Sequence, residues 1–237
     1  MAKSGQSLQF SLAHPIPYTI KTMSTIKVIS FDVEGTLVTT DFSYGIWFEA
    51  IPESYAQRHG MTVEQAKIAV EEEYRKIGDQ RMEWYDINYW VKKFDLGTRD
   101  ALMDKCSSRV ACYPDTLEIL SSLNSSYMLS LASGSPREFL HYLLRDISHH
   151  FAHVFSSTSD YRQLKDSTFY RKMCRKMDVS PEEVVHVGDN WQFDYLAATE
   201  AGLTAFHLDR TGQKRSNDSL TTLTQLKAFL PKTSLSS

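Results

Sequence analysis

The stretch IKVISFDVEGTL, residues 26–37, decides the fold. Its opening part, IKVISF, is a short apolar, β-branched run that is typical of a buried strand. The run ends at Asp32, and because open α/β sheets bind ligands at the carboxyl ends of their strands, this carboxylate is placed where it can act. Glu34 follows two residues later, so the two acids can divide the roles of nucleophile or metal ligand and of proton donor. An ordinary strand-to-turn junction, with Gly35 in the turn, remains the alternative at this point.

The composition is that of a folded globular protein. The chain has 237 residues, 42% of them hydrophobic and 23% charged, which is enough for one large domain or a domain with an insertion. A net charge of −3 argues against a nucleic-acid partner, which would select for a basic surface. No apolar run approaches the roughly 20 residues that cross a bilayer, so no membrane partner is expected. The three cysteines lack C-x-x-C spacing and indicate reduced thiols in a cytoplasmic protein.

Residues 1–22 differ from the rest of the chain. They contain no acidic residue, and Pro15 and Pro17 interrupt the unbroken apolar core that a secretory signal needs. We therefore expect a disordered N-terminal extension, with the folded chain beginning at Met23. A targeting segment of the transit-peptide type is the alternative, because acidic residues are absent.

Residues 41–111 have the pattern of an inserted all-helical domain. Apolar and aromatic residues recur at helical spacing, as in residues 63–70. The sequence TVEQ at 62–65 is a capping box that starts a helix, and Gly60 and Gly97 are predicted to end helices. No strand is predicted in this segment, so it forms a small helical bundle whose aromatic residues are mostly core.

Strands and helices alternate in the remainder of the chain. The predicted strands are short apolar runs at residues 127–132, 153–156, 184–187 and 204–208, with helices between them. An amphipathic helix is predicted over residues 220–230. The alternation predicts an α/β fold, a doubly wound parallel sheet with right-handed crossovers, formed by residues 23–40 and 112–237.

Two further segments place polar groups at the same edge of this sheet. The second strand runs into Ser133, Gly134 and Ser135, where hydroxyls and free backbone N–H groups at the start of a helix can bind an anion. Ser135 also fits a helix cap, with Pro136 at the first helical position, and we favour that role for it. Lys165 lies in the loop after the third strand, where a lysine alone is usually solvated.

The fourth strand ends, like the first, on a carboxylate. Asp189 and Asn190 follow this strand, and Asp194 lies five residues beyond Asp189. Paired carboxylates at one sheet edge suit Mg²⁺, which binds one or two of them and keeps waters for a substrate phosphate. The alternative for Asp194 is that it caps the next helix. His186, inside the strand, is predicted to be a core histidine with satisfied hydrogen bonds.

Together these segments resemble the four motifs of the haloacid dehalogenase-like hydrolase superfamily, in order and in spacing. The residues that carry the resemblance are Asp32-Val33-Glu34-Gly35-Thr36, Ser133, Lys165, and Gly188-Asp189 with Asp194. The resemblance covers residues 26–230, and the helical insert is similar to the cap domain of many members. It implies a Rossmann-like core with an inserted helical cap.

The resemblance also implies a phosphatase-type chemistry. Asp32 attacks phosphorus to form an aspartyl-phosphate, and Glu34 protonates the leaving oxygen and then activates water. Mg²⁺ is the implied cofactor, bound by the carboxylates of Asp32 and Asp189 and by the backbone carbonyl of Glu34. The implied phosphate-binding residues are Ser133, Gly134 and Lys165, and the supporting residues are Thr36, Asn190 and Asp194.

One position departs from the common pattern of the family. Most phosphatases of this superfamily have Asp where this chain has Glu34, whose side chain reaches about one methylene further. Because a misplacement of ~1 Å can cost ~100-fold in rate, Glu34 either works in an adjusted loop or signals an unusual substrate. The enolase-phosphatases of the superfamily also read Asp-x-Glu-Gly-Thr, so the change is compatible with turnover.

Two other functions stay open. A 2-haloacid dehalogenase uses the same Asp nucleophile without a metal, and the sequence GSP at 134–136 is similar to that subfamily. Dehalogenases lack the acids found here at Glu34 and Asp189, so the presence of both favours phosphate and Mg²⁺. A catalytically silent binding protein on the same scaffold is the third reading, left open by the departure at Glu34.

The sequence thus predicts a Mg²⁺-dependent hydrolase of small phosphate monoesters, whose partner is a small phosphorylated metabolite. A cap that closes over the site excludes water and bulky partners. Within the helical insert, residues 78–81 separate two helices, and Arg81 is a candidate for binding a second anionic group of the substrate. The identity of the metabolite and the oligomeric state do not follow from the sequence.

Overall fold

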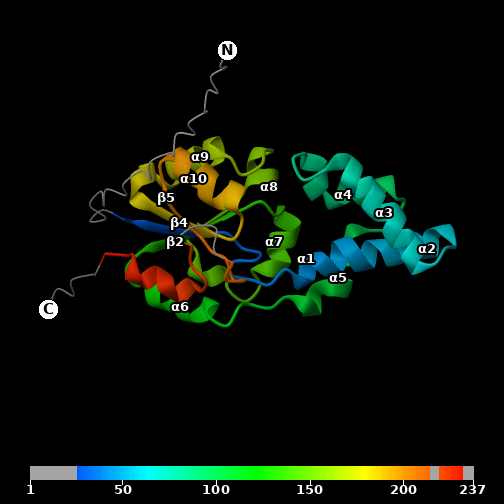
Figure 1. Cartoon of the computed structure of the whole chain (residues 1–237), viewed down its shortest axis with the longest axis horizontal. Coiled ribbons are helices and arrows are strands. Elements are labelled where there is room, and N and C mark those ends of the chain that lie inside the picture. The colour runs from blue at the N-terminus through cyan, green and yellow to red at the C-terminus, as the bar shows by residue number, and fades with distance from the viewer. Residues whose placement is uncertain (1–25, 214–218, 232–237) are drawn as a thin grey trace, which may run out of the picture.

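A computed structural model describes residues 26–213 and 219–231 of the chain (Figure 1). The extension predicted for residues 1–22 lies outside this part. Five parallel strands form one sheet in the order β3-β2-β1-β4-β5. They are β1 (Val28–Phe31), β2 (Met128–Ser133), β3 (His153–Ser156), β4 (Val184–Gly188) and β5 (Thr204–His207). The predicted parallel α/β fold is confirmed.

Helices cover both faces of the sheet, because successive residues of each strand point to opposite sides. On one face, Ile29 and Phe31 of β1 belong to a core that also contains residues of α6 (Thr116–Leu123), α7 (Arg137–Leu143) and η8 (Leu223–Ala228). On the other face, Val28 packs in a second core with α9 (Ser167–Met177) and α10 (Ala197–Ala201). Figure 1 shows these two helical layers above and below the strands. The sheet is therefore doubly wound.

Short helices complete the connections of this core. They are η5 (Ser148–His150), α8 (Ser157–Tyr161), η6 (Pro181–Glu183) and η7 (Trp191–Leu196). A capping box between Ser180 and Glu183 starts η6. Among the helices of the part that the structure describes, none is both long and apolar enough to cross a bilayer.

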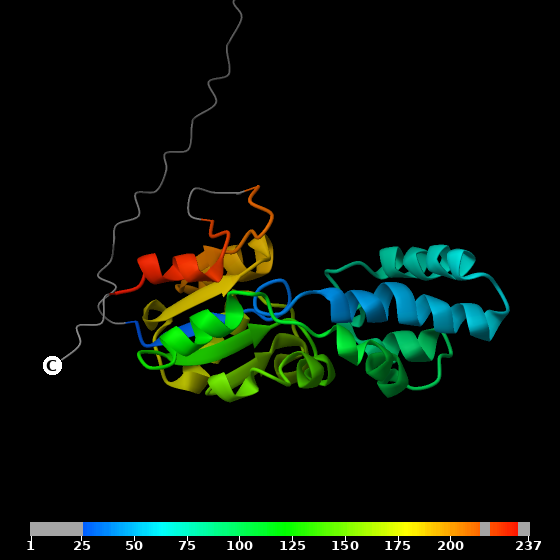
Figure 2. The same cartoon turned by 90° about the horizontal axis from the view of Figure 1, so that it is seen from below.

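The segment between β1 and α6 folds into a separate helical lobe beside the sheet (Figures 1 and 2). Its elements are α1 (Asp41–Gly45), η2 (Ile46–Ala50), α2 (Ile51–His59), α3 (Val63–Ile77), η3 (Met82–Tyr85), α4 (Ile87–Lys93), α5 (Arg99–Cys106) and η4 (Ser107–Arg109). Aromatic rings form the centre of the lobe: Trp90 is fully buried, 4.6 Å from the ring of Tyr74 and 5.4 Å from that of Phe94. Such ring pairs stabilise a small bundle.

Most of the local signals in this lobe are placed as the sequence predicts. The Thr62 hydroxyl accepts from the Gln65 N–H, and the Gln65 side chain accepts from the Thr62 N–H. Gly60 ends α2 in the left-handed conformation, with φ 64°. The prediction for Gly97 is wrong, because α4 ends earlier and Asp95, with φ 52°, is the left-handed residue that follows it. Aspartate tolerates this conformation better than most residues.

The amphipathic helix predicted over residues 220–230 is wrong in its extent. The structure has only the short 3₁₀ helix η8, preceded by a capping box between Thr222 and Gln225. Leu220 instead pairs with Leu208 in a parallel bridge next to β5. The segment therefore begins as an addition to the sheet edge, and the helix starts only after it.

Candidate active site

The carboxyl ends of β1, β2 and β4 meet at the sheet edge that faces the helical lobe. Phe31 of β1 lies beside Val187 of β4, and the Asp32 N–H donates to the Val187 carbonyl at 2.9 Å, so the strand pairing fixes Asp32 at this edge. A cavity of about 390 Å³ opens here. The predicted site residues that line it are Asp32, Glu34, Ser133, Gly134, Lys165, Asp189, Asn190 and Asp194.

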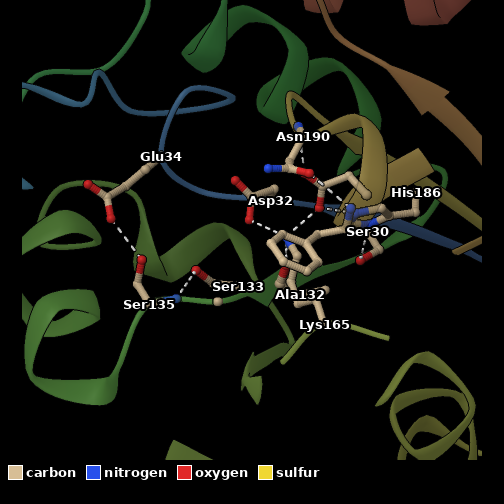
Figure 3. Close-up of polar contacts among 12 residues, drawn as sticks. Ser30, Asp32, Glu34, Ala132, Ser133, Ser135, Lys165, His186 and Asn190 are labelled. Atoms are coloured by element: carbon tan, nitrogen blue, oxygen red, sulfur yellow. Dashed lines mark hydrogen bonds and ion pairs between the residues drawn. The ribbon is translucent and has the colours of Figure 1, made fainter. Parts of the chain in front are cut away.

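Lys165 lies at the centre of a buried polar network under this cavity (Figure 3). Its Nζ is 2.5 Å from Oδ1 of Asp32 and donates to the carbonyl oxygen of Ala132 at 3.1 Å. It also forms an ion pair with Asp194. Lys165, from the loop after β3, is therefore a buried ammonium group with three partners at the strand ends and not a solvated surface lysine.

The charged groups of this network shift one another's pKa. Burial alone would raise the pKa of Asp194, but Lys165 and a hydrogen bond with His186 hold that pKa below its usual range. For Asp32, burial outweighs the attraction of Lys165, and repulsion by Asp194 and Asp189 adds to it, so the pKa of Asp32 is raised well above its usual value. Asp194 is therefore the stable counter-charge of Lys165, and Asp32 is the more basic of the two carboxylates.

Asp194 does not cap the helix that follows β4. Asn190 has that role, since its Oδ1 accepts from two backbone N–H groups of the first turn of η7 at 3.0 and 2.9 Å. Asp194 turns inward, and its Oδ2 accepts from the Asn190 N–H at 2.9 Å. Only glycine fits at Gly188, because a Cβ there would lie 2.2 Å from the Asp194 carboxyl carbon. The capping alternative for Asp194 is thus wrong.

His186 is a satisfied core histidine, as predicted, and it also connects to the site. The register of β1 and β4 pairs it with Ser30, whose Oγ lies 3.1 Å from Nδ1. Its Nε2 lies 3.1 Å from Asp194 Oδ1 and 3.0 Å from the hydroxyl of Tyr170. Burial lowers the pKa of His186, which favours the neutral imidazole, and this ring is hydrogen-bonded to Asp194. Sequence reasoning did not single out Ser30 or Tyr170.

Three carboxylates at the floor of the cavity form a group suited to a metal ion. Asp32, Asp189 and Asp194 each offer an oxygen, and these atoms lie within 4.8 Å of one another. The Asp189 side chain reaches solvent, yet burial around it and the charge of Asp194 raise its pKa to about 7. Crowded carboxylates with excess negative charge have the oxygen donor set that Mg²⁺ prefers. The residues present therefore fit this ion.

The loop after β1 packs closely against Asp189. Gly35 has φ 77°, and a Cβ there would lie 2.2 Å from Oδ2 of Asp189, so only glycine fits. This approach brings the peptide between Glu34 and Gly35 next to the carboxylates. Thr36 is fully buried, and its carbonyl accepts from Arg210 at 2.6 Å, which anchors the loop from outside the cavity.

Glu34 points towards Ser135, which lies just before α7 (Figure 3). Its Oε2 accepts a hydrogen bond of 2.7 Å from the Ser135 hydroxyl, and its Oε1 is buried without a hydrogen-bond partner among the described residues. Burial raises the pKa of Glu34, opposed by the nearby hydroxyls of Ser43 and Ser135. A raised pKa suits an acid that donates a proton near neutral pH.

The prediction that Ser135 caps a helix is wrong. α7 begins at Arg137, its N-cap position is Pro136, and no side chain caps it. The Ser135 hydroxyl donates to Glu34 instead, and its N–H donates to Ser133 Oγ at 3.0 Å. The local sequence Ser-Pro-Arg-Glu fits a cap equally well, whereas Glu34 is 101 positions away and becomes a neighbour only in the fold.

The turn at the end of β2 is held by the segment that follows β3. The Thr158 hydroxyl donates to the Gly134 carbonyl at 3.0 Å, and the Ser156 hydroxyl donates to the Ser135 carbonyl at 2.8 Å. Nothing lies within 4 Å of the position that a Cβ at Gly134 would occupy, so the space beside it is open. Ser133, buried at the strand end, and Gly134 thus border an open part of the cavity where an anion can enter.

Arg81 is not brought to the cavity. Its exposed guanidinium pairs with Glu83. The helical lobe instead contributes Ser43, Trp47, Asp79, Trp84 and Tyr85 to the lining. Helical spacing assigned aromatic residues of this kind mostly to the core, because a periodic pattern does not tell which rings face a site.

Comparisons with known proteins agree with this geometry. Residues 26–202 match the family model described as haloacid dehalogenase-like hydrolase. The GMP/IMP nucleotidase YrfG of Escherichia coli K12 is 24% identical over 101 residues, which are 43% of this chain and 45% of that protein. The chain thus spans about half the length of the curated relatives it matches.

Two solved structures show the same fold. The HAD phosphatase from Thermococcus onnurineus has a TM-score of 0.77 at 24% identity, covering 86% of this chain and 97% of that one. A 2-haloacid dehalogenase from Pseudomonas syringae pv. Tomato DC3000 has a TM-score of 0.59 at 20% identity, covering 86% of this chain and 97% of that one. The region that matches the family model contains the strands and loops of the site. The chain belongs to the haloacid dehalogenase-like hydrolase family.

Proposed function

We propose that the protein is a Mg²⁺-dependent hydrolase of small phosphate monoesters that acts through an aspartyl-phosphate on Asp32. The observation that carries the proposal is the position of Asp32 at the cavity floor, paired with the Lys165 ammonium and close to the Asp189 carboxylate. A basic carboxylate in this position can attack phosphorus beside groups that offset the charge of the phosphate. The similarity to a phosphatase and to a nucleotidase supports this class of reaction.

Asp32 and Glu34 carry the first half of the reaction. A carboxylate oxygen of Asp32 bonds to phosphorus while the bond between phosphorus and the alcohol oxygen breaks. Oδ1 accepts from Lys165, which leaves Oδ2 as the attacking oxygen. Glu34 gives its proton to the departing alcohol oxygen. The Ser133 hydroxyl binds an oxygen of the phosphoryl group, and the positive charge of Lys165 beside Asp32 offsets the negative charge of that group.

Glu34 acts in the opposite direction in the second half. Its carboxylate takes a proton from a water molecule, whose oxygen bonds to phosphorus as the bond to Asp32 breaks. Inorganic phosphate leaves, and both residues are then in their starting states, Asp32 as a free carboxylate and Glu34 with the proton that it took from the water. The hydrogen bond from Ser135 keeps Glu34 oriented in both steps.

The carboxylates of Asp32 and Asp189, with the backbone carbonyl of Glu34, would hold the Mg²⁺. The bound ion supplies positive charge that stabilises the transferring phosphoryl group. Asp194 and His186 keep Lys165 in place on the other side of Asp32. Residues 41–111 are the proposed cap, which limits the site to small esters, over a core of residues 23–40 and 112–237.

Three reactions separate the proposal from its rivals. Phosphate release from acetyl phosphate and a panel of phosphate monoesters is measured with MgCl₂ and with EDTA, and chloride release from 2-chloropropionate is measured in parallel. A phosphatase releases phosphate only with Mg²⁺, a dehalogenase releases chloride without it, and a silent binding protein does neither. The absence of phosphate release from every ester would contradict the proposal.

Mg²⁺ is expected to raise the melting temperature, and more at pH 8 than at pH 6. With a pKa of about 7, Asp189 is mostly protonated at pH 6 and ionised at pH 8, and the ionised form binds the ion. At roughly 100 times its dissociation constant, the ion stabilises the fold by about 2.7 kcal/mol, which corresponds to roughly 5–10 °C. Thermal melting with and without MgCl₂ at both pH values measures the effect.

Without Mg²⁺, the folding stability is expected to fall as the pH rises, whereas the stabilisation by Mg²⁺ increases with pH. Because the pKa of Asp189 is higher in the folded protein than in the unfolded chain, stability falls as the pH rises from about 4 towards 7. Asp189→Asn should remove much of this slope and most of the stabilisation by Mg²⁺. Asp146→Asn, at an exposed ion pair outside the cavity lining, is the matched control and should keep both. An unchanged Mg²⁺ response in Asp189→Asn would show that Asp189 is not a ligand.

Glu34→Asp is expected to lower kcat by about 100-fold. The shorter side chain withdraws from Ser135, whose hydroxyl is placed for the longer acid. Ser135→Ala should lower kcat by less than Glu34→Asp does. The double variant should have the same kcat as Glu34→Asp alone, because the hydrogen bond is already lost in that variant. Ser135→Thr, which keeps the hydroxyl, is the control. Higher activity in Glu34→Asp, or losses that add, would contradict the view that Ser135 positions Glu34.

A further inference from the structure

A second, smaller cavity adjoins the active-site cavity inside the helical lobe. It has a volume of about 140 Å³ and is lined by the aromatic side chains of Trp47, Phe48, Tyr74 and Trp84. Trp47 and Trp84 also line the active-site cavity, so the two spaces share these walls. These residues come from η2, α3 and η3, all in the lobe beside the strand ends (Figure 1).

The walls of this aromatic cavity are formed by rings, and the hydroxyl of Tyr74 is already hydrogen-bonded within the lobe. That residue is 4% exposed, and its hydroxyl donates to the backbone carbonyl of Trp47 at 3.0 Å. The rings of the other three residues lie near it at centroid distances of 5.7 to 6.3 Å. Trp47 also stacks on Phe139 of α7 at 5.4 Å, and Phe139 lines the active-site cavity. An aromatic surface therefore extends from the lobe to the start of α7.

The charge of the two cavities disfavours a substrate with a second anionic group. The active-site cavity is rich in carboxyl groups, which belong to Asp32, Glu34, Asp79, Asp189 and Asp194. Lys165 is the one basic residue in the described lining, and it is already bound to Asp32 and Asp194. The aromatic cavity adds no charged side chain. A carboxylate or second phosphate on the alcohol would be repelled by these carboxylates and would find no free basic side chain among the described residues of the lining to pair with.

We infer that the substrate carries an uncharged, flat ring on its alcohol part, which stacks against Trp84 and Trp47 while its phosphate lies at Asp32. This inference rests on the proposed phosphatase activity and specifies its substrate class. The size is suitable, since an apolar cavity of ~150 Å³ takes up benzene. Rings favour offset or edge-on contact with other rings, which the walls supply. A ring joined directly to the phosphate-bearing carbon and a base joined through a sugar share this chemistry.

Two matched pairs of esters measure the effect of the ring. Adenosine 5′-monophosphate and ribose 5-phosphate differ by the base, and benzyl phosphate and ethyl phosphate differ by a phenyl ring. We expect the ring to raise kcat/KM by roughly 10- to 100-fold in one pair, and the responding pair shows whether the ring is reached through a sugar. 2-Phosphoglycolate, which carries a carboxylate, should be a poorer substrate than ethyl phosphate. Equal kcat/KM values within both pairs would overturn the inference.

Variants of Trp84 test whether this residue is responsible for the preference for ring-bearing esters. In Trp84→Ala, the ratio of kcat/KM values within the responding pair should fall towards one, and Trp84→Phe, which keeps a ring, should retain most of it. Both variants keep the Trp84 carbonyl that accepts from Trp90 Nε1 at 3.3 Å. Tyr89→Ala is the matched control, since Tyr89 is half-buried in the same lobe and lines neither cavity. A ratio that survives Trp84→Ala, or falls equally in Tyr89→Ala, would overturn the assignment.

Acetyl phosphate separates this inference from the proposed function, because it has neither a ring nor a second anionic group. Mg²⁺-dependent release of phosphate from acetyl phosphate, with no preference for ring-bearing esters, overturns the substrate class alone. No release from acetyl phosphate or from any ester overturns both proposals.

Discussion

Asp32→Asn should reduce phosphate release by on the order of 10⁶-fold, the loss that follows removal of a covalent nucleophile. The amide has almost the same shape as the carboxylate, but it is uncharged and a poor nucleophile. The exchange also removes the counter-charge that Lys165 meets at 2.5 Å. Initial rates of phosphate release at saturating ester and Mg²⁺, followed down to the detection limit, measure the effect.

Folding has to be controlled in this comparison. Asp146→Asn makes the same chemical change at an exposed residue that pairs with Arg145, and it should retain full activity. Circular dichroism melting curves should show a cooperative transition in both variants. A folded Asp32→Asn protein that keeps more than about a thousandth of the activity would exclude Asp32 as the nucleophile, because a nucleophile's removal costs far more.

Lys165→Met should destabilise the fold by about 3–5 kcal/mol and also remove activity, since it leaves Asp32 and Asp194 buried without a cation. The pKa of Asp194 is held below its usual range in the folded protein, so the contribution of this ion pair is present above the unfolded pKa and is lost as the pH falls. The deficit of the variant should therefore be largest at neutral pH and shrink below about pH 4. Urea unfolding at several pH values measures it.

Lys227→Met is a suitable control for the loss of an ion pair. Lys227 pairs with Glu118 at the surface, where both side chains are exposed, and such pairs contribute little. This variant should unfold at nearly the same urea concentration as the wild type. Equal stability of Lys165→Met and the wild type at pH 7 would contradict the view that Lys165 is held by two buried charges.

The sheet edge could be predicted because its signals are local and repeated. Two apolar runs end on Asp32 and Asp189, and the rule that parallel strands share their carboxyl ends brings these residues together. The structure places the oxygens of both within 4.8 Å of each other and of Asp194. Lys165 could be placed only through the family resemblance, because a loop lysine has no pattern of its own.

Contacts between distant segments could not be predicted. Ser135 lies in a sequence that fits a helix cap, and nothing local reveals that its hydroxyl donates to Glu34. Asn190 and Asp194 are both residue types that cap helices. Asn190 is the cap of η7 because Asp194 is turned inward, where it contacts His186 and Lys165. The parts of the site missed by sequence reasoning are therefore those that hold the acids in place.

In the helical lobe, too, the sequence did not reveal which residues line the cavities. Its periodicity predicts a buried aromatic core, and Trp90 and Tyr74 satisfy this prediction. Trp47 and Trp84 follow the same pattern but are half-buried and line the cavities. Arg81, the predicted substrate-contact residue of this lobe, is charged, whereas three of the five lobe residues that line the active-site cavity are aromatic: Trp47, Trp84 and Tyr85. Periodicity separates core from solvent and does not identify the walls of a cavity between two lobes.

The central claim is that phosphate is transferred to Asp32, and trapping the phosphorylated protein tests it most directly. Glu34→Gln should slow the second half-reaction, and with acetyl phosphate, whose leaving group needs no proton, the first half should persist. Acid quenching after reaction with ³²P-labelled acetyl phosphate and Mg²⁺ should yield close to one label per chain, on the peptide that contains Asp32 and removable by hydroxylamine. Turnover without label on the protein, or label that persists in the combined variant with Asp32→Asn, would contradict the account.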